Sequence, residues 1–533
     1  MSECTHIDQV KVVAAPELVC LDCQRSGDDW HHLRMCRSCG YVGCCDESPN
    51  QHARKHFEKS GHPIIQSVEP GEDWSWCFVD EVYVEFPSIA DANPEAKRVI
   101  RSFLMISGIY TLSASLIWGV NTLFLLDAGL DIMGVFIANA VFTGSMALFE
   151  IPTGVLADTR GRRASFLLSV AIVLLGTLGY VANASIGGHL MGFVIMSIFL
   201  GLGYTFYSGA VEAWLVDALE STNYSGLLDK VFARGGMVSG AAMLLGSIGG
   251  GFLASQNLSY PFVLRAALLA IVFIIAWFTM HDMGFQPVKS TWRKLPAEMS
   301  AIASVSIRYG WREKPVRLLI MASLVISLFM AWGFHAWQPY FMDLLGQNLP
   351  WVAGFIAAAV ALASMIGNSF VEWVTRFCGK RTTLLLWAVG VQAVVVIGVG
   401  VTTNFWVAVS LYLVAMIAMG VMGPVRQAFM HANIPSSQRA SVISFDSLVS
   451  NAGSMTGQLG LGRLGQLQSL SAGYIVGGFI TFLAVPVFLR LRMLKTPSDQ
   501  IVGSAGENGP CAAQGLPSAA GLNTAAPNTN RDQ

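Results

Sequence analysis

Residues 154–163 read Gly154-Val155-Leu156-Ala157-Asp158-Thr159-Arg160-Gly161-Arg162-Arg163, and they stand between apolar runs near 131–153 and 164–184. Each run has about the 20 residues that an α-helix needs to cross the hydrocarbon layer of a membrane. The polar stretch between them is therefore a tight turn at the membrane surface. Its arginines place the turn on the cytoplasmic side, because short cytoplasmic loops concentrate Lys and Arg.

The composition extends this interpretation to most of the chain. Hydrophobic residues make up 53% of the 533 residues and charged residues only 13%, and the mean hydropathy is +0.53. Soluble globular proteins carry about 25% charged residues, so a soluble protein of this length is excluded. The apolar runs predict twelve transmembrane helices, near 103–126, 131–153, 164–184, 188–218, 231–255, 260–281, 317–343, 350–376, 382–401, 404–430, 439–462 and 471–491.

The distribution of basic residues predicts the orientation of these helices. Residues 1–30 contain no apolar segment of the kind found in signal peptides, so we expect the N-terminus to stay in the cytoplasm. An even number of helices then returns the C-terminus to the same side. Of the 33 lysines and arginines, only Arg265 and Arg463 fall towards the predicted outer side, as the positive-inside rule requires. We therefore expect a multi-pass protein of the cell membrane, embedded in the lipid bilayer, with both termini cytoplasmic.

The helices divide into two sets of six. The longest connection between them, residues 282–316, separates the sets, and the turn Gly379-Lys380-Arg381 repeats the pattern Gly161-Arg162-Arg163 at the same relative place. Many secondary transporters are built from such repeats, with the substrate path between the halves. Basic turns occur in any protein that obeys the positive-inside rule, so the paired turns alone leave the repeat undecided.

The spacing Gly154, Asp158, Gly161 and Arg162 resembles the helix 2–3 motif of the major facilitator superfamily. The likeness covers about residues 103–492 and implies a secondary transporter that works by alternating access. It also implies that Asp158 and Arg162 form a charge cluster, or latch, with an acidic residue at the inner end of helix 4, for which we take Asp217. Thr159 departs from the pattern, which usually has a basic residue there.

Ionisable residues inside transmembrane helices are functional candidates, because burying them in lipid is costly. The best proton carrier is Glu212, which would share an i, i+4 face with Ser208 and Tyr204 on helix 4. Glu150 and Asp446 are further candidates. The alternative interpretation for each is interfacial anchoring or pairing with another helix.

Polar and aromatic residues in the middle of the spans predict a substrate cavity. The candidates are Trp118, Asn121, Tyr204, Tyr207, His335, Gln338, Asn451 and Ser454. Aromatic walls with few fixed charges favour an amphipathic or cationic small molecule. Trp and Tyr are also common at membrane interfaces, so the substrate class stays open.

The first 84 residues carry a different signal. Cysteines and histidines recur there at short spacings, as in Cys20-x2-Cys23, Cys36-x2-Cys39 and His52-x3-His56, which are typical of zinc sites. A reducing cytoplasm favours metal binding over disulfides. A module this small needs its metal in order to fold.

This segment resembles the UBP-type zinc finger of ubiquitin-specific proteases, over about residues 2–84. The resemblance implies interleaved ligand sets, each with four members: Cys20, Cys23, Cys44 and His52; Cys36, Cys39, His56 and His62; and Cys4, His6, Cys77 and Asp80. Asp80 stands where the family has a last cysteine, so two or three Zn²⁺ ions are expected according to whether the third site is occupied.

In the family, this finger binds the C-terminal tail of ubiquitin through an arginine and several aromatic residues. Trp76, Phe78 and Tyr83 fall on aromatic positions, but Asp46 occupies the position of the arginine. A carboxylate repels a C-terminal carboxylate, which argues against ubiquitin. Acidic residues outnumber basic ones in this module, which argues against nucleic acid as well. A basic peptide or protein tail, or the loops of the chain itself, fits better.

We therefore expect an all-α polytopic membrane protein with two six-helix halves and a small α+β zinc-binding domain. The predicted segments are a finger (1–84), a linker (85–100), a first half (101–281), a central loop (282–316), a second half (317–492) and a disordered tail (493–533). The predicted function is export of a small molecule coupled to H⁺, with the finger in a regulatory or docking role. The alternatives are a proton-coupled importer and a membrane-anchored sensor or scaffold whose finger recruits a cytosolic partner. The sequence presents no nucleophile–base constellation, so we expect no enzyme.

Overall fold

The computed structural model describes residues 4–11, 19–69, 72, 74–84, 93–207, 209–222, 224, 226–284, 311–434 and 439–501. Most of the predicted central loop and tail, part of the linker, Ser208 and the side chain of Asp158 lie outside the described residues. The finger and the helical bundle are treated separately below.

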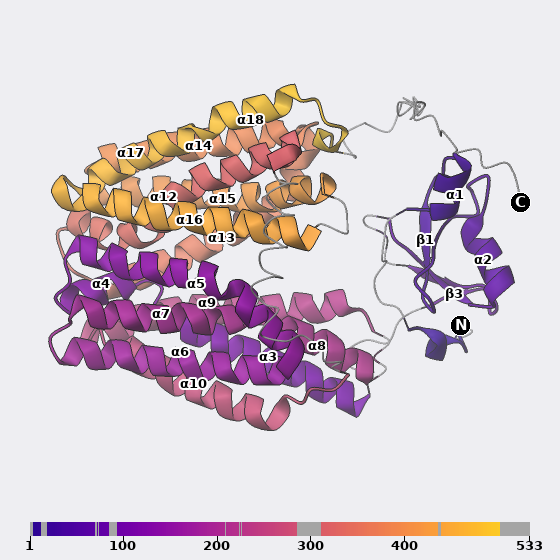
Figure 1. The fold of residues 1–533 in the computed structure, drawn as a ribbon, viewed down its shortest axis with the longest axis horizontal. Helices are drawn as coiled ribbons and strands as arrows, with labels where there is room; N and C mark the ends of the chain where they lie inside the picture. The colour runs from indigo at the N-terminus through magenta and orange to yellow at the C-terminus, as the bar shows by residue number, and fades with distance from the viewer. Residues whose placement is uncertain are drawn as a thin grey trace, which may run out of the picture.

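The bundle contains a helix or helix pair at each of the twelve predicted spans (Figure 1). In chain order these are α3 (Pro94–Ser115) with α4 (Asn121–Asp127), α5 (Ile132–Arg160), α6 (Arg162–Ser185), α7 (Leu190–Tyr207) with α8 (Ala210–Ser221), α9 (Leu228–Gln256), α10 (Tyr260–Thr279), α12 (Lys314–Leu345), α13 (Pro350–Phe377), α14 (Arg381–Val401), α15 (Phe405–Ala432), α16 (Arg439–Leu467), and α17 (Leu470–Phe482) with α18 (Ala484–Met493).

Among the described residues, ten of these segments are long and apolar enough to cross a membrane. The two others are α3–α4 and α16. Helix α3 begins with a charged turn, and α16 carries several polar residues, among them Asp446 and Gln458. Asp446 and Gln458 are both buried within the bundle, so the helix does not need an apolar surface all round. The predicted fold class, a helical membrane bundle with a small zinc-finger domain, is confirmed.

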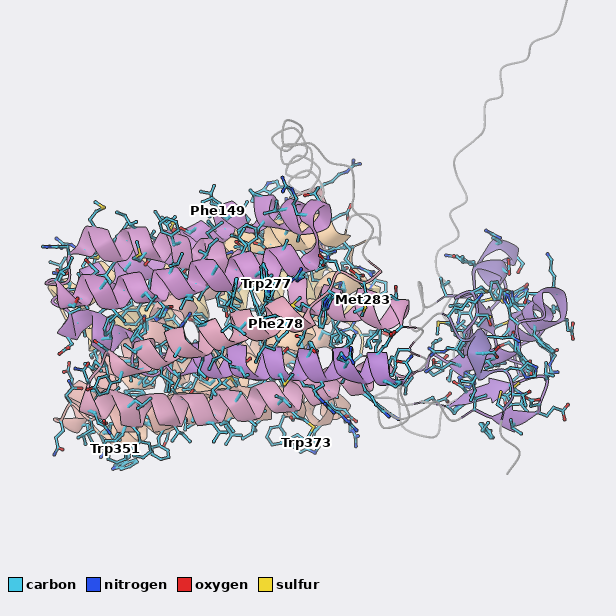
Figure 2. The ribbon with its side chains drawn as sticks, turned by 90° about the horizontal axis from the view of Figure 1, so that it is seen from below. Phe149, Trp277, Phe278, Met283, Trp351 and Trp373 are labelled. Carbon is cyan, nitrogen blue, oxygen red and sulfur yellow. The ribbon has the colours of Figure 1, made fainter. Side chains whose placement is uncertain are left out.

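The side chains on the outer surface of the bundle agree with a lipid environment. Figure 2 shows Trp351 and Trp373 near opposite ends of α13 and Trp277 with Phe278 on α10. Phe278 is 72% exposed and Trp373 is 57% exposed. Large apolar side chains on this scale would be an aggregation hazard in water. Tryptophans near the two ends of a span are typical of anchoring at the two membrane interfaces.

The two halves meet along two helix pairs, in which α5 packs on α16 and α9 packs on α13. Small residues allow the second contact. A Cβ atom on Gly354 would lie 2.8 Å from the Cα of Gly251, so a larger residue at either position would push the helices apart. Close helix approach through glycine is a common device in membranes. The ends of the bundle are named here by the chain: α3 begins and α18 ends at the terminal end, and the opposite end is the distal end (Figure 1).

The structure corrects two boundaries of the predicted segments. Helix α3 begins at Pro94, inside the predicted linker, because the Asn93 side chain accepts a hydrogen bond from the Ala96 N–H at 2.7 Å and proline suits the first helical position. The first residues of the predicted disordered tail are ordered. Asp499 is 3% exposed and accepts hydrogen bonds from the Thr382 N–H and Oγ1, both at 2.8 Å, which satisfies the first turn of α14.

Helix 4 also differs from its prediction. It breaks between α7, which ends at Tyr207, and α8, which begins at Ala210. Gly209 has a φ of 75°, a left-handed conformation that glycine adopts without steric cost. The break turns Glu212 into a residue of the first turn of α8, so the continuous i, i+4 face with Tyr204 does not exist.

The finger consists of one antiparallel sheet with short helices. The strands are β1 (Leu33–Cys36), β2 (Val42–Cys44), β3 (Ile64–Ser67), β4 (Ser75–Cys77) and β5 (Val82–Tyr83), in the order β2-β1-β3-β4-β5. The helical elements are η1 (Ile7–Gln9), α1 (Leu21–Ser26) and α2 (His52–Ser60). The apolar core is small and includes Cys20, Cys23 and Cys44 together with Leu33, Met35 and Val42. A core in which cysteines replace large apolar residues depends on what those cysteines bind.

Candidate functional site

A cavity of about 370 Å³ lies between the two halves of the bundle. Residues from α5, α6, α7 and α10 of the first half and from α12 and α16 of the second half line it. Its volume is at the lower end of the range for small-molecule sites. Apolar and aromatic side chains share the lining with nine residues that carry polar groups: Asn121, Asn139, Thr143, Thr177, Tyr180, Tyr204, Arg265, His335 and Gln458.

Half of the predicted substrate residues lie on this central cavity. Trp118, Asn121, Tyr204 and His335 line it. His335 is also packed edge-on against Phe334 at a centroid distance of 5.4 Å. Ser454 lines neither this cavity nor the one described next.

A second cavity lies next to the first, on the side of the terminal end. The two cavities share Met146 and Tyr204 as lining residues. Tyr207 and Asn451, predicted for the substrate site, line this terminal cavity, and so do the carboxylates Glu150 and Glu212. Both carboxylates are exposed, so the cavity communicates with water.

Gln338, predicted for the substrate site, lies at a contact between the two halves. Its side chain is completely buried. Its Oε1 accepts a hydrogen bond from the Thr122 N–H at 2.8 Å, and its Nε2 donates to the Trp118 carbonyl at 2.9 Å. Because Gln338 belongs to α12 and its partners precede and begin α4, this side chain joins the two halves. It closes the bundle on the distal side of the cavity.

Other contacts at the distal end also hold the two halves together. The Gln466 Nε2 donates to Asp131 Oδ2 at 2.6 Å, from α16 to the N-cap of α5. The rings of Phe136 and Trp332 stack across the halves at a centroid distance of 5.7 Å. These contacts close the bundle on the distal side of the central cavity, and the terminal cavity lies next to it at its other end.

Asp446, predicted as a proton-coupling candidate, forms an ion pair in the structure. Arg426 donates to both carboxylate oxygens, at 3.1 Å and 2.8 Å. The pair joins α15 to α16 within the second half and is largely buried. Such bidentate, charge-assisted contacts are stronger than hydrogen bonds between neutral groups. Glu150 differs, because its carboxylate accepts a hydrogen bond from a neutral group, Ser447 Oγ, at 3.3 Å.

The helix 2–3 turn brings part of the predicted latch together. Gly161, at φ 102°, makes the turn from α5 to α6, and Gly154 lies within α5. The Arg162 Nε lies 3.9 Å from Asp217 Oδ2 on α8. This contact joins the turn to helix 4, as the motif implies. The side chain of Asp158 lies outside the described residues.

The sequence interpretation missed Arg265. It was counted only as a basic residue towards the outer side, yet it sits on α10, is 8% exposed and lines the central cavity. A charged residue inside the apolar run Tyr260–Thr279 is itself a signal, because such residues face a cavity or a partner. Tyr180, Thr177 and Phe262 on the same wall carry no sequence signal of this kind.

The finger brings the predicted metal ligands into three groups of four. These groups are Cys20, Cys23, Cys44 and His52; Cys36, Cys39, His56 and His62; and Cys4, His6, Cys77 and Asp80. Within each group all the ligand atoms lie within 4.8 Å of one another. Each group draws on segments far apart in the chain, so the sets interleave.

The distances in the first group test whether zinc fits. Zinc bonds of about 2.3 Å to sulfur and about 2.0 Å to nitrogen in a tetrahedron imply about 3.8 Å between sulfurs and about 3.5 Å between sulfur and nitrogen. Cys23 Sγ lies 3.7 Å from Cys44 Sγ, and the three sulfurs lie 3.2–3.5 Å from His52 Nδ1. The His52 N–H also points to Cys44 Sγ at 3.2 Å, an outer contact that orients such ligands.

The other two groups have similar spacings. In the second group, Cys39 Sγ and His62 Nδ1 lie 3.2 Å and 3.4 Å from His56 Nε2. In the third, Asp80 Oδ2 lies 2.8 Å from His6 Nδ1 and 3.6 Å from Cys77 Sγ. The carboxylate of Asp80 therefore stands as the fourth potential ligand beside two sulfurs and a histidine nitrogen. Hydrogen bonds from the Thr5 N–H and from His6 hold the pKa of Asp80 well below its usual range.

Burial disfavours the charged form of two thiols in these groups. Burial raises the pKa of Cys23 to about 12 and that of Cys36 to about 11. Without a cation they stay protonated at neutral pH, and a bound zinc ion displaces the protons. The groups would thus hold Zn²⁺ as a structural ion that replaces missing hydrophobic core.

Asp46, which was expected to repel an anionic tail, is itself paired. It accepts a hydrogen bond from Arg54, and the Arg54 guanidinium lies 5.2 Å from the centroid of the Phe78 ring. Trp76 and Tyr83 pack edge-to-face at 5.1 Å. The negative charge at position 46 is therefore compensated within the finger, which weakens the electrostatic argument drawn from the sequence.

Comparison with known families agrees with both units. The model described as "Major Facilitator Superfamily" matches residues 103–375 and 350–521, and the model described as "Zn-finger in ubiquitin-hydrolases and other protein" matches residues 20–89. The chain belongs to the Major Facilitator Superfamily. It carries an N-terminal zinc finger of the UBP type, so the predicted family membership is confirmed.

Similar proteins agree with this assignment. An uncharacterized MFS-type transporter of Bacillus subtilis (strain 168), YxaM, is 20% identical over 417 residues, which cover 76% of this chain and 97% of the relative. The class G tetracycline resistance protein of Vibrio anguillarum is 23% identical over 395 residues, covering 69% and 96%. The crystal structure of the nucleoside transporter NupG superposes with a TM-score of 0.62 at 10% identity, covering 74% of this chain and 99% of NupG. The similarity to NupG shows only that the two proteins share a fold.

Proposed function

We propose that this Major Facilitator Superfamily member is a proton-coupled exporter of a small amphipathic molecule. It works by alternating access, and its terminal end faces the cytoplasm. In this arrangement the cavity opens to the cytoplasm and is closed on the outer side. Substrate enters through the terminal cavity, binds between the halves and leaves when the distal contacts separate.

One observation carries the proposal: a cavity lined by both halves lies next to a cavity with exposed carboxylates at one end and is closed by inter-half hydrogen bonds at the other. A transporter needs such a site, reached from one side at a time. The similarity to the tetracycline resistance protein supports export as the direction.

Glu212 and Glu150 are the proposed proton carriers. Both lie in the terminal cavity on the route to the substrate site, and no arginine or lysine pairs with either of them among the described residues. A carboxylate in a cavity that alternately meets two solutions can load and release a proton. Asp446 is not proposed, because both of its carboxylate oxygens accept hydrogen bonds from Arg426.

The finger is proposed to regulate or dock the transporter at its cytoplasmic end, as a zinc-stabilised module that binds a protein or peptide. The alternatives remain an importer driven by protons and a sensor in which the bundle does not transport. The position of the terminal cavity next to the central cavity favours transport over the sensor, and it favours neither direction.

The test is proton movement in everted vesicles that contain the full-length protein. A pH-reporting dye follows a preformed gradient while cationic, neutral and anionic amphipathic compounds are added. Dissipation of the gradient by a compound, lost in Glu212→Gln and kept in Glu220→Gln, would support proton antiport. Glu220 is a suitable control because it is an exposed residue near the end of the same helix, α8, and lines neither cavity.

Correctly inserted protein that responds to none of the compounds would contradict the export proposal. A pull-down with the finger that recovers a cytosolic partner, together with such a negative result, would favour the sensor.

A further inference from the structure

The central cavity contains a cationic group without an anionic neighbour. Arg265 is 8% exposed, and its Nε is buried without a hydrogen-bond partner. Among the described residues, Arg265 makes neither a hydrogen bond nor an ion pair with any side chain or carbonyl. The titratable groups near it are the phenols of Tyr110, Tyr180 and Tyr204, which are neutral at physiological pH.

An isolated buried charge is costly, because it loses its hydration without gaining a partner. Other buried charges of the described bundle have partners, since Asp446 pairs with Arg426 and Asp499 accepts two hydrogen bonds from Thr382. Arg265 has no such partner, although it faces an empty volume of sufficient size. A ligand that supplies an anion would remove the penalty at Arg265.

The rest of the cavity indicates what kind of anion fits. The walls near Arg265 are aromatic and apolar, with Phe262 on the same helix and Phe142 on α5. Two more polar atoms have no partner there, His335 Nδ1 and Gln458 Oε1. The cavity therefore combines one fixed positive charge, a few neutral hydrogen-bonding groups and a large apolar surface.

We propose that the central cavity binds an amphipathic organic monoanion whose carboxylate is held by Arg265 and whose apolar body lies between Phe142 and Phe262. The planar guanidinium presents two parallel N–H groups that match a carboxylate. Among the described residues that line this cavity, Arg265 is the one fixed cation, so a single negative charge is compensated, and Glu150 and Glu212 in the adjoining cavity disfavour a second. This proposal rests on the proposed transport function and names its substrate class.

The proposal revises the expectation of a cationic substrate. A cation in the central cavity would meet a buried like charge in a medium of low dielectric constant, where the repulsion is strong. The sequence expectation rested on aromatic walls with few fixed charges and did not count Arg265 among the cavity residues. Its position on the cavity wall reverses the sign of the preferred ligand.

Binding can be measured separately from transport on the purified full-length protein in detergent. The probes are three compounds with one aromatic body: 2-naphthoate, 2-naphthamide and 2-naphthylmethylammonium. Titration calorimetry gives the affinity for each. We expect the order naphthoate, then naphthamide, then the ammonium compound. Arg265→Gln should weaken naphthoate binding by about ten- to a hundredfold, the effect of losing a charge-assisted hydrogen-bonded pair, and Arg265→Lys should weaken it less.

Two controls keep the result interpretable. Naphthamide affinity unchanged in Arg265→Gln shows that the cavity is intact. Arg463→Gln removes an exposed arginine of α16 and should leave all three affinities unchanged. Absence of saturable naphthoate binding to the parent protein, an unchanged naphthoate affinity in Arg265→Gln, or preferred binding of the ammonium compound would each overturn the proposal.

Transport assays test the exporter proposal separately from the proposed anion site. Naphthoate that binds through Arg265 but never moves a proton gradient would refute the exporter while the anion site stands. A gradient dissipated by the ammonium compound and not by naphthoate would refute the anion site while the exporter stands.

Discussion

Gln338 offers a direct test of alternating access in this protein. In Gln338→Leu the side chain keeps its approximate size but loses both hydrogen bonds to the first half. The Thr122 N–H and the Trp118 carbonyl then remain buried without partners in the conformation described here. Each unsatisfied group costs about 1–3 kcal/mol. When the distal end opens, water reaches both groups and the penalty disappears.

The substitution should therefore shift the equilibrium towards the distally open conformation. Even the lower figure, about 2 kcal/mol for the two groups, corresponds to roughly a thirtyfold change in population. The readout is a reporter cysteine at Ala331, which lines the central cavity and accepts a cysteine with little change in size. A membrane-impermeant methanethiosulfonate reagent is added outside intact cells. The native cysteines lie on the predicted cytoplasmic side and should not react.

We expect the reporter in Ala331→Cys to react at least tenfold faster when Gln338→Leu is also present. The matched control is Gln392→Leu. Gln392 is also completely buried, but its contact, to Met330 Sδ at 2.9 Å, lies within the second half, so its loss should affect both conformations equally. Equal labelling rates with and without Gln338→Leu, in protein that is folded and inserted, would refute the assignment of Gln338 as a contact between the halves.

Three further substitutions test the charges and the metal groups. Asp446→Asn should leave Arg426 uncompensated and cost about 3 kcal/mol, seen as a lower melting temperature in detergent; the double change Arg426→Met with Asp446→Leu should recover most of it, and a double variant no better than the single one would contradict the pairing. Asp80→Ala should lower zinc from three to two per chain by elemental analysis, whereas Asp80→Cys should keep three; three ions in Asp80→Ala would exclude Asp80 as a ligand. Arg162→Ala should reduce transport at least tenfold without loss of insertion, and Arg160→Ala, which removes an exposed side chain, should not; normal transport in Arg162→Ala would remove the latch assignment.

Features that depend on local spacing could be predicted from the sequence. The membrane spans follow from apolar runs of sufficient length, since every backbone polar group must be paired within the helix in lipid. Helix α5 and the turn at Gly161 follow in this way. The metal groups follow from short Cys and His spacings, read through the resemblance to the UBP-type finger, and the structure places Cys20, Cys23, Cys44 and His52 within one group.

Contacts between distant helices could not be predicted in this way. Gln338, predicted for the substrate site, makes a contact between the halves at the distal end. Arg265, counted from the sequence only as a basic residue towards the outer side, lines the central cavity. Hydrophobicity assigns a residue to a span but does not say which neighbouring helix its side chain meets. Glu212 shows a second limit, because the break at Gly209 interrupts the helical periodicity from which its face was inferred.

The sequence by itself determined that most of this chain lies in a membrane, how many spans it has and which residue types can hold zinc. These properties depend on the free energy of transfer of local segments and on ligand chemistry, both of which are independent of distant contacts. Only the tertiary structure decided which polar groups are paired and which face the cavity. Pairing depends on which helices pack against each other. Helices α15 and α16 bring Arg426 to Asp446, whereas Arg265 on α10 has no partner among the described residues.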